Sequence, residues 1–128
     1  ELLSVLRNKI VDSGYVIFEV PHANDFLITK LKCSKFIDFT LWSQHLILHT
    51  RDSLKAFLLE AGYSNVTIQA KQRYSLANHL CWLAHGEPGG HKRDLSLIDT
   101  MELKNAYERS LQVINATDTL IAVGQVNK

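Results

Sequence analysis

The sequence has 128 residues, of which 46% are hydrophobic and 21% charged, so it can bury the core of one domain, residues 1–128, and is not disordered. Its net charge of +1 and the lack of a long basic run argue against a nucleic-acid partner, and no apolar run of about 18 residues indicates a membrane partner. Cys33 and Cys81 are too few for a disulfide framework. They favour a reducing compartment, and we therefore expect a cytoplasmic protein.

The chain begins with a predicted helix, a predicted strand and a polar loop. Leucine and isoleucine side chains at helical spacing predict a helix over residues 1–13, which Gly14 ends. Residues 15–20 (Tyr-Val-Ile-Phe-Glu-Val) are almost continuously apolar, as is typical of a strand buried on both faces of a sheet. The loop 22–25 follows the carboxyl end of this strand, which is where ligands bind in open α/β sheets.

The middle of the chain predicts an aromatic segment, a helix and a second strand. The aromatic and apolar residues of segment 36–49 are expected to pack in the core or to form one wall of a substrate site. Within this segment, His45 and His49 are four residues apart and would share one face if it were helical. Thr50 is a good N-cap for a helix over 51–61. Alternating apolar and polar residues over 66–71 then predict a half-exposed edge strand.

Residues 72–91 are the most distinctive stretch, because they hold three of the six histidines and one of the two tryptophans. They lie inside a long connection, residues 72–117, between two predicted strands, and such connections usually have a structure and a function of their own. The elements expected from there on are a short helix over 76–84 that Ser75 could cap, a turn at 86–90, a helix within 96–115 and a continuous apolar strand over 119–124.

The three strands predict an α/β sheet with the last strand between the other two. Strands 15–20 and 66–71 are joined by a helical crossover and should be parallel. Strand 119–124 is apolar throughout, so it needs a neighbour on both sides. This order leaves one edge of strand 15–20 open, although its sequence is that of an internal strand. The open edge could pair with another chain, for instance in a homodimer.

Several short motifs along the whole chain resemble the C-terminal half of a class I S-adenosylmethionine-dependent methyltransferase, in a bacterial subgroup. The motifs are Gly14-Tyr-Val-Ile-Phe-Glu-Val-Pro21, Asn24-Asp25, Trp42 to His45, Ser53-Leu54, Ala61-Gly62-Tyr63, Gln72-Arg73-Tyr74, Asn78-His79, Trp82-Leu83, Pro88-Gly-Gly-His91 and Asp118-Thr119. The resemblance implies a partial Rossmann-like sheet of strands 5-7-6, with the last strand antiparallel and a helical insertion before it.

The resemblance also implies what this chain does not carry. The family binds its cofactor, S-adenosylmethionine, through a glycine-rich loop and acidic residues on earlier strands, and no segment of this sequence corresponds to them. We therefore expect a fragment with no cofactor-binding residues of its own, inactive alone, that supplies acceptor recognition to the full-length enzyme. Relatives suggest a small-molecule or glycan-like acceptor. The alternative is a complete, non-catalytic binding or dimerisation module that pairs through the open strand edge.

Candidate catalytic residues follow the first strand and lie in the aromatic segment. His22, Asp25 and His45 could act as the general base that methyl transfer to a hydroxyl or amine needs, and Asn24 could bind the acceptor. The ordinary structural interpretation of residues 22–25 is a turn with an Asx-type hydrogen bond.

A second set of candidates lies in residues 72–91. Arg73, Tyr74, Asn78, His79 and His91 could line the acceptor pocket, or they could form a polar network that fixes the insertion to the sheet. A metal-dependent enzyme is a third hypothesis, but we expect no metal. The pair His45 and His49 lacks further ligands, and the histidine and cysteine spacings after residue 78 do not match a structural zinc pattern.

Overall fold

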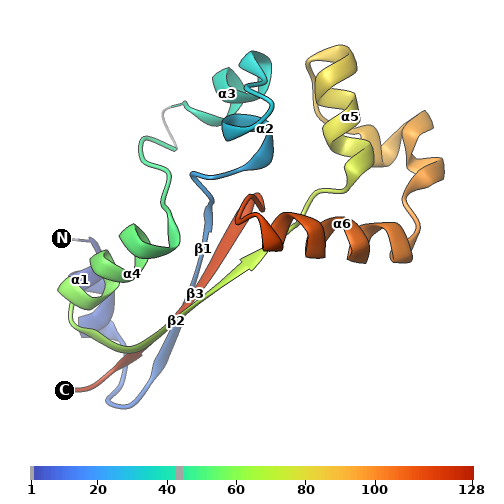
Figure 1. Cartoon of the computed structure of the whole chain (residues 1–128). Helices are drawn as coiled ribbons and strands as arrows, with labels where there is room; N and C mark the ends of the chain where they lie inside the picture. Colours follow the sequence, from blue (N-terminus) through green and yellow to red (C-terminus); the bar gives the residue numbers. More distant parts are fainter. Residues whose placement is uncertain (1, 43–44) are drawn as a thin grey trace.

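A computed structural model describes residues 2–42 and 45–128 (Figure 1). Glu1, in the predicted first helix, and Ser43 and Gln44, in the Trp42 to His45 motif, lie outside the described residues. The elements in chain order are α1 (Leu2–Lys9), β1 (Tyr15–Pro21), α2 (Phe26–Thr29), α3 (Ser34–Thr40), α4 (Arg51–Glu60), β2 (Tyr63–Lys71), α5 (Leu76–His85), the 3-10 helices η1 (Gly90–Lys92) and η2 (Asp94–Ile98), α6 (Met101–Val113) and β3 (Thr119–Val126).

The sheet has the order β1-β3-β2, and β3 is antiparallel to both neighbours. Tyr15 pairs with Gln125 at one end of β1, and Pro21 pairs with Thr119 at the other. Because β3 is apolar throughout, the central position is the only one in a three-stranded sheet that shields both of its edges. The predicted position and direction of the last strand are confirmed. The outer edge of β1 has no strand partner among the described residues.

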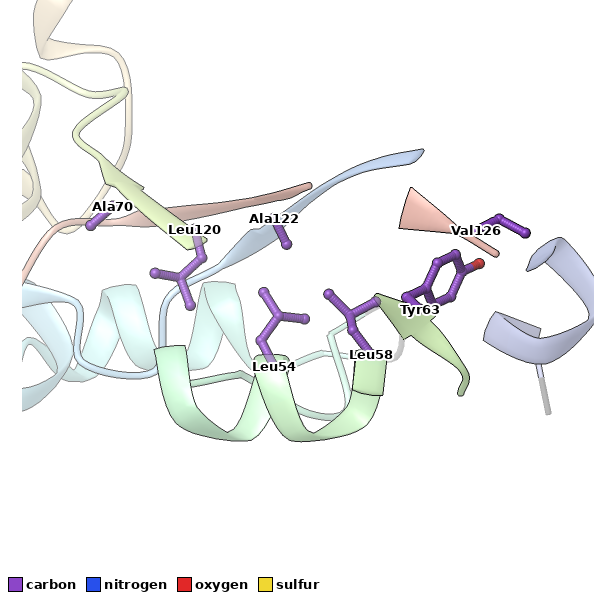
Figure 2. Close-up of a cluster of buried hydrophobic side chains, with 7 residues drawn as sticks. All are labelled: Leu54, Leu58, Tyr63, Ala70, Leu120, Ala122 and Val126. Atoms are coloured by element: carbon purple, nitrogen blue, oxygen red, sulfur yellow. The ribbon is translucent and has the colours of Figure 1, made fainter. Parts of the chain in front are cut away.

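The hydrophobic core lies between one face of the sheet and α4, next to α1 (Figure 2). Leu54 and Leu58 point from α4 toward Leu120 and Ala122 of β3, and all four are buried. Burial of side chains of this size supplies roughly 1.5–3 kcal/mol each. Thr50 begins α4 with a capping box, in which its hydroxyl accepts a hydrogen bond from the Ser53 N–H at 3.2 Å. The predicted cap and the predicted helix are confirmed to within one residue.

Two expectations for β1 and its surroundings are wrong. Only one face of β1 is buried, because Tyr15 and Ile17 on the other face are 65% and 69% exposed. The first helix ends at Lys9, four residues earlier than predicted, and the chain turns through Ser13 at a positive φ of 59°. The second strand begins at Tyr63 rather than residue 66, and a register shift between Ser64 and Thr67 interrupts its alternating pattern.

The long connection between β2 and β3 folds into α5, two short 3-10 helices and α6. Ser75 occupies the N-cap position of α5 but makes no side-chain cap, because its hydroxyl donates to Asp99 at 2.6 Å instead. The predicted helix within 96–115 is confirmed as α6, which Thr100 caps after η2. At Gly90 the chain lies so close to α5 that an added Cβ would sit 2.0 Å from the Ala77 carbonyl oxygen. None of the described helices is long and apolar enough to cross a membrane.

Candidate functional site at the carboxyl ends of the outer strands

Two neighbouring cavities lie where β1 and β2 end and β3 begins. In Figure 1 this end of the sheet has α2 and α3 on one side and α5 and α6 on the other. The first cavity, called here the acidic cavity, has a volume of about 260 Å³ and is lined by Glu19, Val20, Pro21, His22, Asp25, Ile28, Phe36, Phe39, Thr40, His45, Arg73, Tyr74, Asp118 and Thr119. The second, called the cationic cavity, has a volume of about 210 Å³ and is lined by Gln72, Arg73, Tyr74, Ser75, His91, Lys104, Tyr107 and Glu108.

His22 is held at the end of β1 by contacts to the chain just before β3. Its side chain is fully buried, and its Nδ1 lies 2.9 Å from the Thr117 carbonyl oxygen. A carbonyl can only accept, so Nδ1 carries the ring proton and Nε2 presents a lone pair. That Nε2 is buried and has no hydrogen-bond partner. Burial lowers the pKa of His22, so the ring is neutral near pH 7.

Asp25 follows three residues later and begins the short helix α2. Its Oδ1 accepts a hydrogen bond from the Leu27 N–H at 2.6 Å, which is an N-cap contact. The residue is only 3% exposed, and burial raises the pKa of its carboxyl to about 7, with a smaller contribution from the charge of Asp118. A carboxyl that exchanges a proton near neutral pH, on the wall of a cavity, is suited to general acid–base chemistry.

Asp118 is the last residue before β3, and its side chain connects this end of the strand to the start of the long connection. Its carboxylate accepts hydrogen bonds from the Arg73 N–H at 2.9 Å, the Tyr74 N–H at 2.9 Å and the Gln72 side chain at 2.8 Å. In return, the Gln72 side-chain oxygen accepts the Asp118 N–H at 3.1 Å. Burial raises the pKa of Asp118, although the two backbone donors oppose that shift. This network fixes the segment that separates the two cavities.

His79, which is buried, and Tyr107, which is half-buried, form a pair behind the cationic cavity. His79 Nδ1 lies 2.7 Å from the Tyr107 hydroxyl, and His79 Nε2 lies 3.4 Å from the Gln72 side-chain nitrogen. Burial lowers the pKa of His79 to about 4 and raises the pKa of Tyr107 to about 12, so both are neutral at physiological pH. His79 lines neither cavity, whereas Tyr107 lines the cationic cavity.

Arg73 and Tyr74 form the wall that both cavities share. Arg73 Nη1 lies 2.5 Å from the carboxylate of Glu19 on β1, and its guanidinium carbon lies 5.9 Å from the centre of the Tyr74 ring. The Tyr74 ring in turn lies 6.1 Å from the ring of His91. Both partners of the Arg73–Glu19 ion pair are about half exposed, so the pair contributes little to stability and can rearrange around a ligand.

The remaining predicted site residues have different positions. His45 lines the acidic cavity, with Nδ1 3.2 Å from the Thr40 carbonyl oxygen. Asn24 lines neither cavity. Asn78 is buried beneath the turn, where its side-chain oxygen accepts the Gly89 N–H at 2.9 Å and lies 3.3 Å from His91 Nδ1. Asn78 therefore helps to hold the turn and the His91 side chain in place.

The two histidine patterns considered for a metal do not form a cluster. The helical interpretation of residues 45–49 is wrong, since α3 ends at Thr40 and the backbone of His49 instead bridges to that of His22. In the parts of the chain that the structure describes, no three histidine, cysteine or carboxylate side chains come together in a way that could hold a metal ion.

Sequence reasoning overlooked several residues of the two cavities, among them Glu19, Gln72, Lys104, Tyr107, Glu108 and Asp118. Gln72 and Asp118 were part of motifs used for the resemblance, so their polarity beside strand ends was a usable signal. Tyr107 lies in the predicted helix within 96–115, and its hydroxyl reaches a buried histidine. Glu19 interrupts an otherwise apolar strand, which is a local sign of a polar edge.

Neither of the two cavities fits S-adenosylmethionine by size. Each of the two cavities is smaller than the roughly 300–1,000 Å³ of sites that enclose a drug-sized ligand. The positive-φ glycines Gly86 and Gly89 lie between α5 and η1 rather than between a strand and a helix, so they do not form a nucleotide-binding turn.

Comparison with models of known protein families gives no match for this sequence, and comparison with curated proteins gives none either. Among solved structures, the chain is similar to a SAM-dependent methyltransferase from Archaeoglobus fulgidus, with a TM-score of 0.52 and 17% sequence identity. The similarity covers 97% of this chain and 50% of that protein's chain. The chain therefore spans about half the length of the methyltransferase it matches, and over that span the two share a fold.

Proposed function

We propose that this chain is the acceptor-recognition portion of a methyltransferase that uses S-adenosylmethionine, with the donor held by residues outside it. The observation that carries the proposal is a carboxyl group with a pKa of about 7 in a cavity at the carboxyl end of a strand, within a fold shared with a methyltransferase. In open α/β sheets this end of the strands is where ligands bind. The strand numbers 5-7-6 for β1, β3 and β2 are part of the same proposal.

In this proposal Asp25 is the general base. Its ionised form would take the proton from an acceptor hydroxyl or amine as the methyl group leaves the sulfur of the donor and bonds to that oxygen or nitrogen. His22 would place the lone pair of Nε2 on the same cavity wall, ready to accept a hydrogen bond from the acceptor. His45 is the third candidate of this kind, on the aromatic side of the cavity. A positioned base of this sort contributes about 10²–10⁴-fold to rate.

The lining of the acidic cavity favours a small acceptor with hydroxyl groups, and a sugar-like ring is our choice. Phe36 and Phe39 present aromatic surface there, and both rings pack against Trp82 with centroids 5.2 and 5.1 Å away. Aromatic surface suits the apolar face of a sugar ring, and a few fixed polar groups on the opposite wall suit its hydroxyls. Arg73 and Tyr74 would close the pocket on the side of the cationic cavity. Asn24 remains a proposed outer contact, because it lines neither cavity.

Two measurements test this function. Calorimetric titration of the 128-residue chain with S-adenosylmethionine should show no binding at micromolar concentration, and tight binding would contradict a donor site outside the chain. A longer polypeptide that contains this chain should transfer label from methyl-labelled S-adenosylmethionine to a hydroxylated acceptor. There, Asp25→Asn should lower the rate about 10²–10⁴-fold. The control Asp38→Asn, at an exposed position of α3, should leave the rate unchanged.

A second candidate function is a pairing module without catalysis, which the open edge and exposed face of β1 favour. Exposed strands of this kind add a strand from another chain, in a homodimer or a complex. A sizing measurement across a range of protein concentrations tests this idea, and a monomer at all concentrations would contradict it for the homodimer.

A further inference from the structure

The cationic cavity differs in charge from the acidic cavity beside it. The acidic cavity is lined by three carboxyl groups, those of Glu19, Asp25 and Asp118. The cationic cavity has Arg73, Lys104 and one carboxylate, Glu108. That carboxylate is already bonded at 2.9 Å to Lys71, which is not part of the lining.

Lys104 projects from the first half of α6 and forms no ion pair with any carboxylate of the described residues. Arg73 is paired with Glu19, but that pair is half exposed and has little stability to lose. The charge of the cavity is therefore available to a ligand, and it is positive. An oxyanion is the ligand that a guanidinium and an ammonium group recognise together.

The buried network behind the cavity determines which way the Tyr107 hydroxyl donates. The Gln72 side-chain nitrogen uses its two hydrogens on the Tyr74 carbonyl at 2.8 Å and on Asp118 at 2.8 Å. An amide nitrogen has no lone pair to accept a hydrogen bond, so it cannot accept one from His79 Nε2, which lies 3.4 Å away. The neutral His79 ring then carries its proton on Nδ1 and donates it to the Tyr107 oxygen at 2.7 Å. Tyr107 is left with its own O–H to donate, on the wall of the cavity.

We propose that the cationic cavity is a binding site for an oxyanion, a carboxylate or phosphate carried by the acceptor, held by Lys104, Arg73 and the Tyr107 hydroxyl. That the anion belongs to the acceptor rests on the proposed function. An acceptor that spans the shared wall of Arg73 and Tyr74 would have its anionic end in the cationic cavity and its neutral, reacting end in the acidic cavity. His79 is a positioning residue in this site, since it orients Tyr107 without reaching the ligand.

The test is a titration of the ¹⁵N-labelled 128-residue chain followed by NMR, at constant ionic strength and pH 7.5. Inorganic phosphate and acetate are the probes, and they distinguish a phosphate site from a carboxylate site. Saturable shifts in the millimolar range are expected for the amides of residues 72–75 and 107, with at least one of the two anions. Lys104→Gln and Tyr107→Phe should each weaken binding about tenfold, because each removes one hydrogen bond to a charged group.

Lys55→Gln is the matched control. It removes an exposed lysine from α4, the helix that covers one face of the sheet, and should leave the affinity for the anion unchanged. Lys104→Gln keeps the folded chain intact, because Lys104 is exposed on a helix. Tyr107→Phe retains the ring but leaves the His79 Nδ1–H without its acceptor, so the ¹⁵N spectrum of this variant is first checked for the native fold. The proposal is overturned if neither anion shifts these amides, or if Lys104→Gln binds as tightly as Lys55→Gln. Anion binding by a chain whose longer polypeptide transfers no methyl group would refute the proposed function and leave this site standing.

Discussion

Replacing Asp25 by asparagine should stabilise the protein, and the gain should depend on pH. The pKa of this carboxyl is about 7 in the folded chain, against 3.8 in its ordinary state, because burial disfavours the ionised form. The difference of about three pKa units corresponds to about 4 kcal/mol of stability, at roughly 1.4 kcal/mol per unit. Asparagine keeps the side-chain oxygen that accepts the Leu27 N–H, so the cap of α2 is retained.

The sign follows from which state holds the proton. Below pH 3.8 the carboxyl is protonated in both states and contributes nothing to pH dependence. Between pH 3.8 and about 7 the unfolded chain releases the proton while the folded chain keeps it, so the wild-type protein loses stability as pH rises. Above pH 7 both states are ionised and the loss is complete. The asparagine variant cannot ionise and lacks this loss.

Urea denaturation at half-unit steps from pH 4 to pH 8.5 measures the effect. The free energy of unfolding of the variant, minus that of the wild type, should increase by about 1.4 kcal/mol per pH unit and become constant above pH 7. A difference that does not change with pH would refute the assignment of a buried, raised pKa to Asp25. Asp12→Asn is a control of opposite sign, because a hydrogen bond from the Lys128 N–H lowers the pKa of Asp12. That variant should be less stable than the wild type by an amount that stays constant from pH 4 upward, because Asp12 is ionised in both the folded and the unfolded wild type there.

Three further predictions concern the long connection. His79 has a pKa of about 4 in the folded chain against 6.5 ordinarily, so the free energy of unfolding of the wild type, minus that of His79→Gln, should fall by up to about 3 kcal/mol as pH falls from 6.5 to 4 in urea titrations. The opposing contribution of Asp25 is present in both proteins and cancels in this difference. Asp118→Ala leaves the Gln72 side chain and the Tyr74 N–H without an acceptor, and it should lower the free energy of unfolding by about 3 kcal/mol at pH 7 in urea titrations. A decrease under about 0.5 kcal/mol would mean that this network does not fix the segment between the two cavities. Gly90→Ala places a methyl group on the Ala77 carbonyl and should lower the thermal midpoint of unfolding. An unchanged midpoint would show that the close approach is not tight.

The sheet and its main covering helix could be predicted because their signals are local and repeated. Residues 119–124 are apolar without interruption, which requires two strand neighbours, and the structure supplies them. Thr50 combines a capping side chain with an apolar stripe behind it, so the start of α4 was certain to within a residue. The exposed face of β1 could not be foreseen, since apolar composition shows that a strand can be buried but does not show what covers it.

The candidate site was predictable as a place and not as a set of contacts. Polar residues after β1 and in the long connection were expected near each other, and His22, Asp25 and Arg73 do meet at one end of the sheet. The direction of each side chain was beyond reach, because it depends on partners distant in the sequence. His79 turns inward to Tyr107, 28 residues away, and the carboxyl that influences Asp25 comes from Asp118 at the far end of the chain.

The central position of β3 has a consequence for how the protein is made. β1 and β2 each pair with β3 and not with each other, so a growing chain that ends before Thr119 contains two strands with no hydrogen-bonded neighbour. β1 and β2 can pair only after β3 has been synthesised, because Tyr15 at the start of β1 pairs with Gln125 near the end of β3. Pairings so distant in sequence are slow to form, and the waiting strands expose edges that other chains can bind. We therefore expect synthesis of β3, rather than of the first strands, to start the pairing of this sheet, and a chaperone that shields β1 to raise its yield.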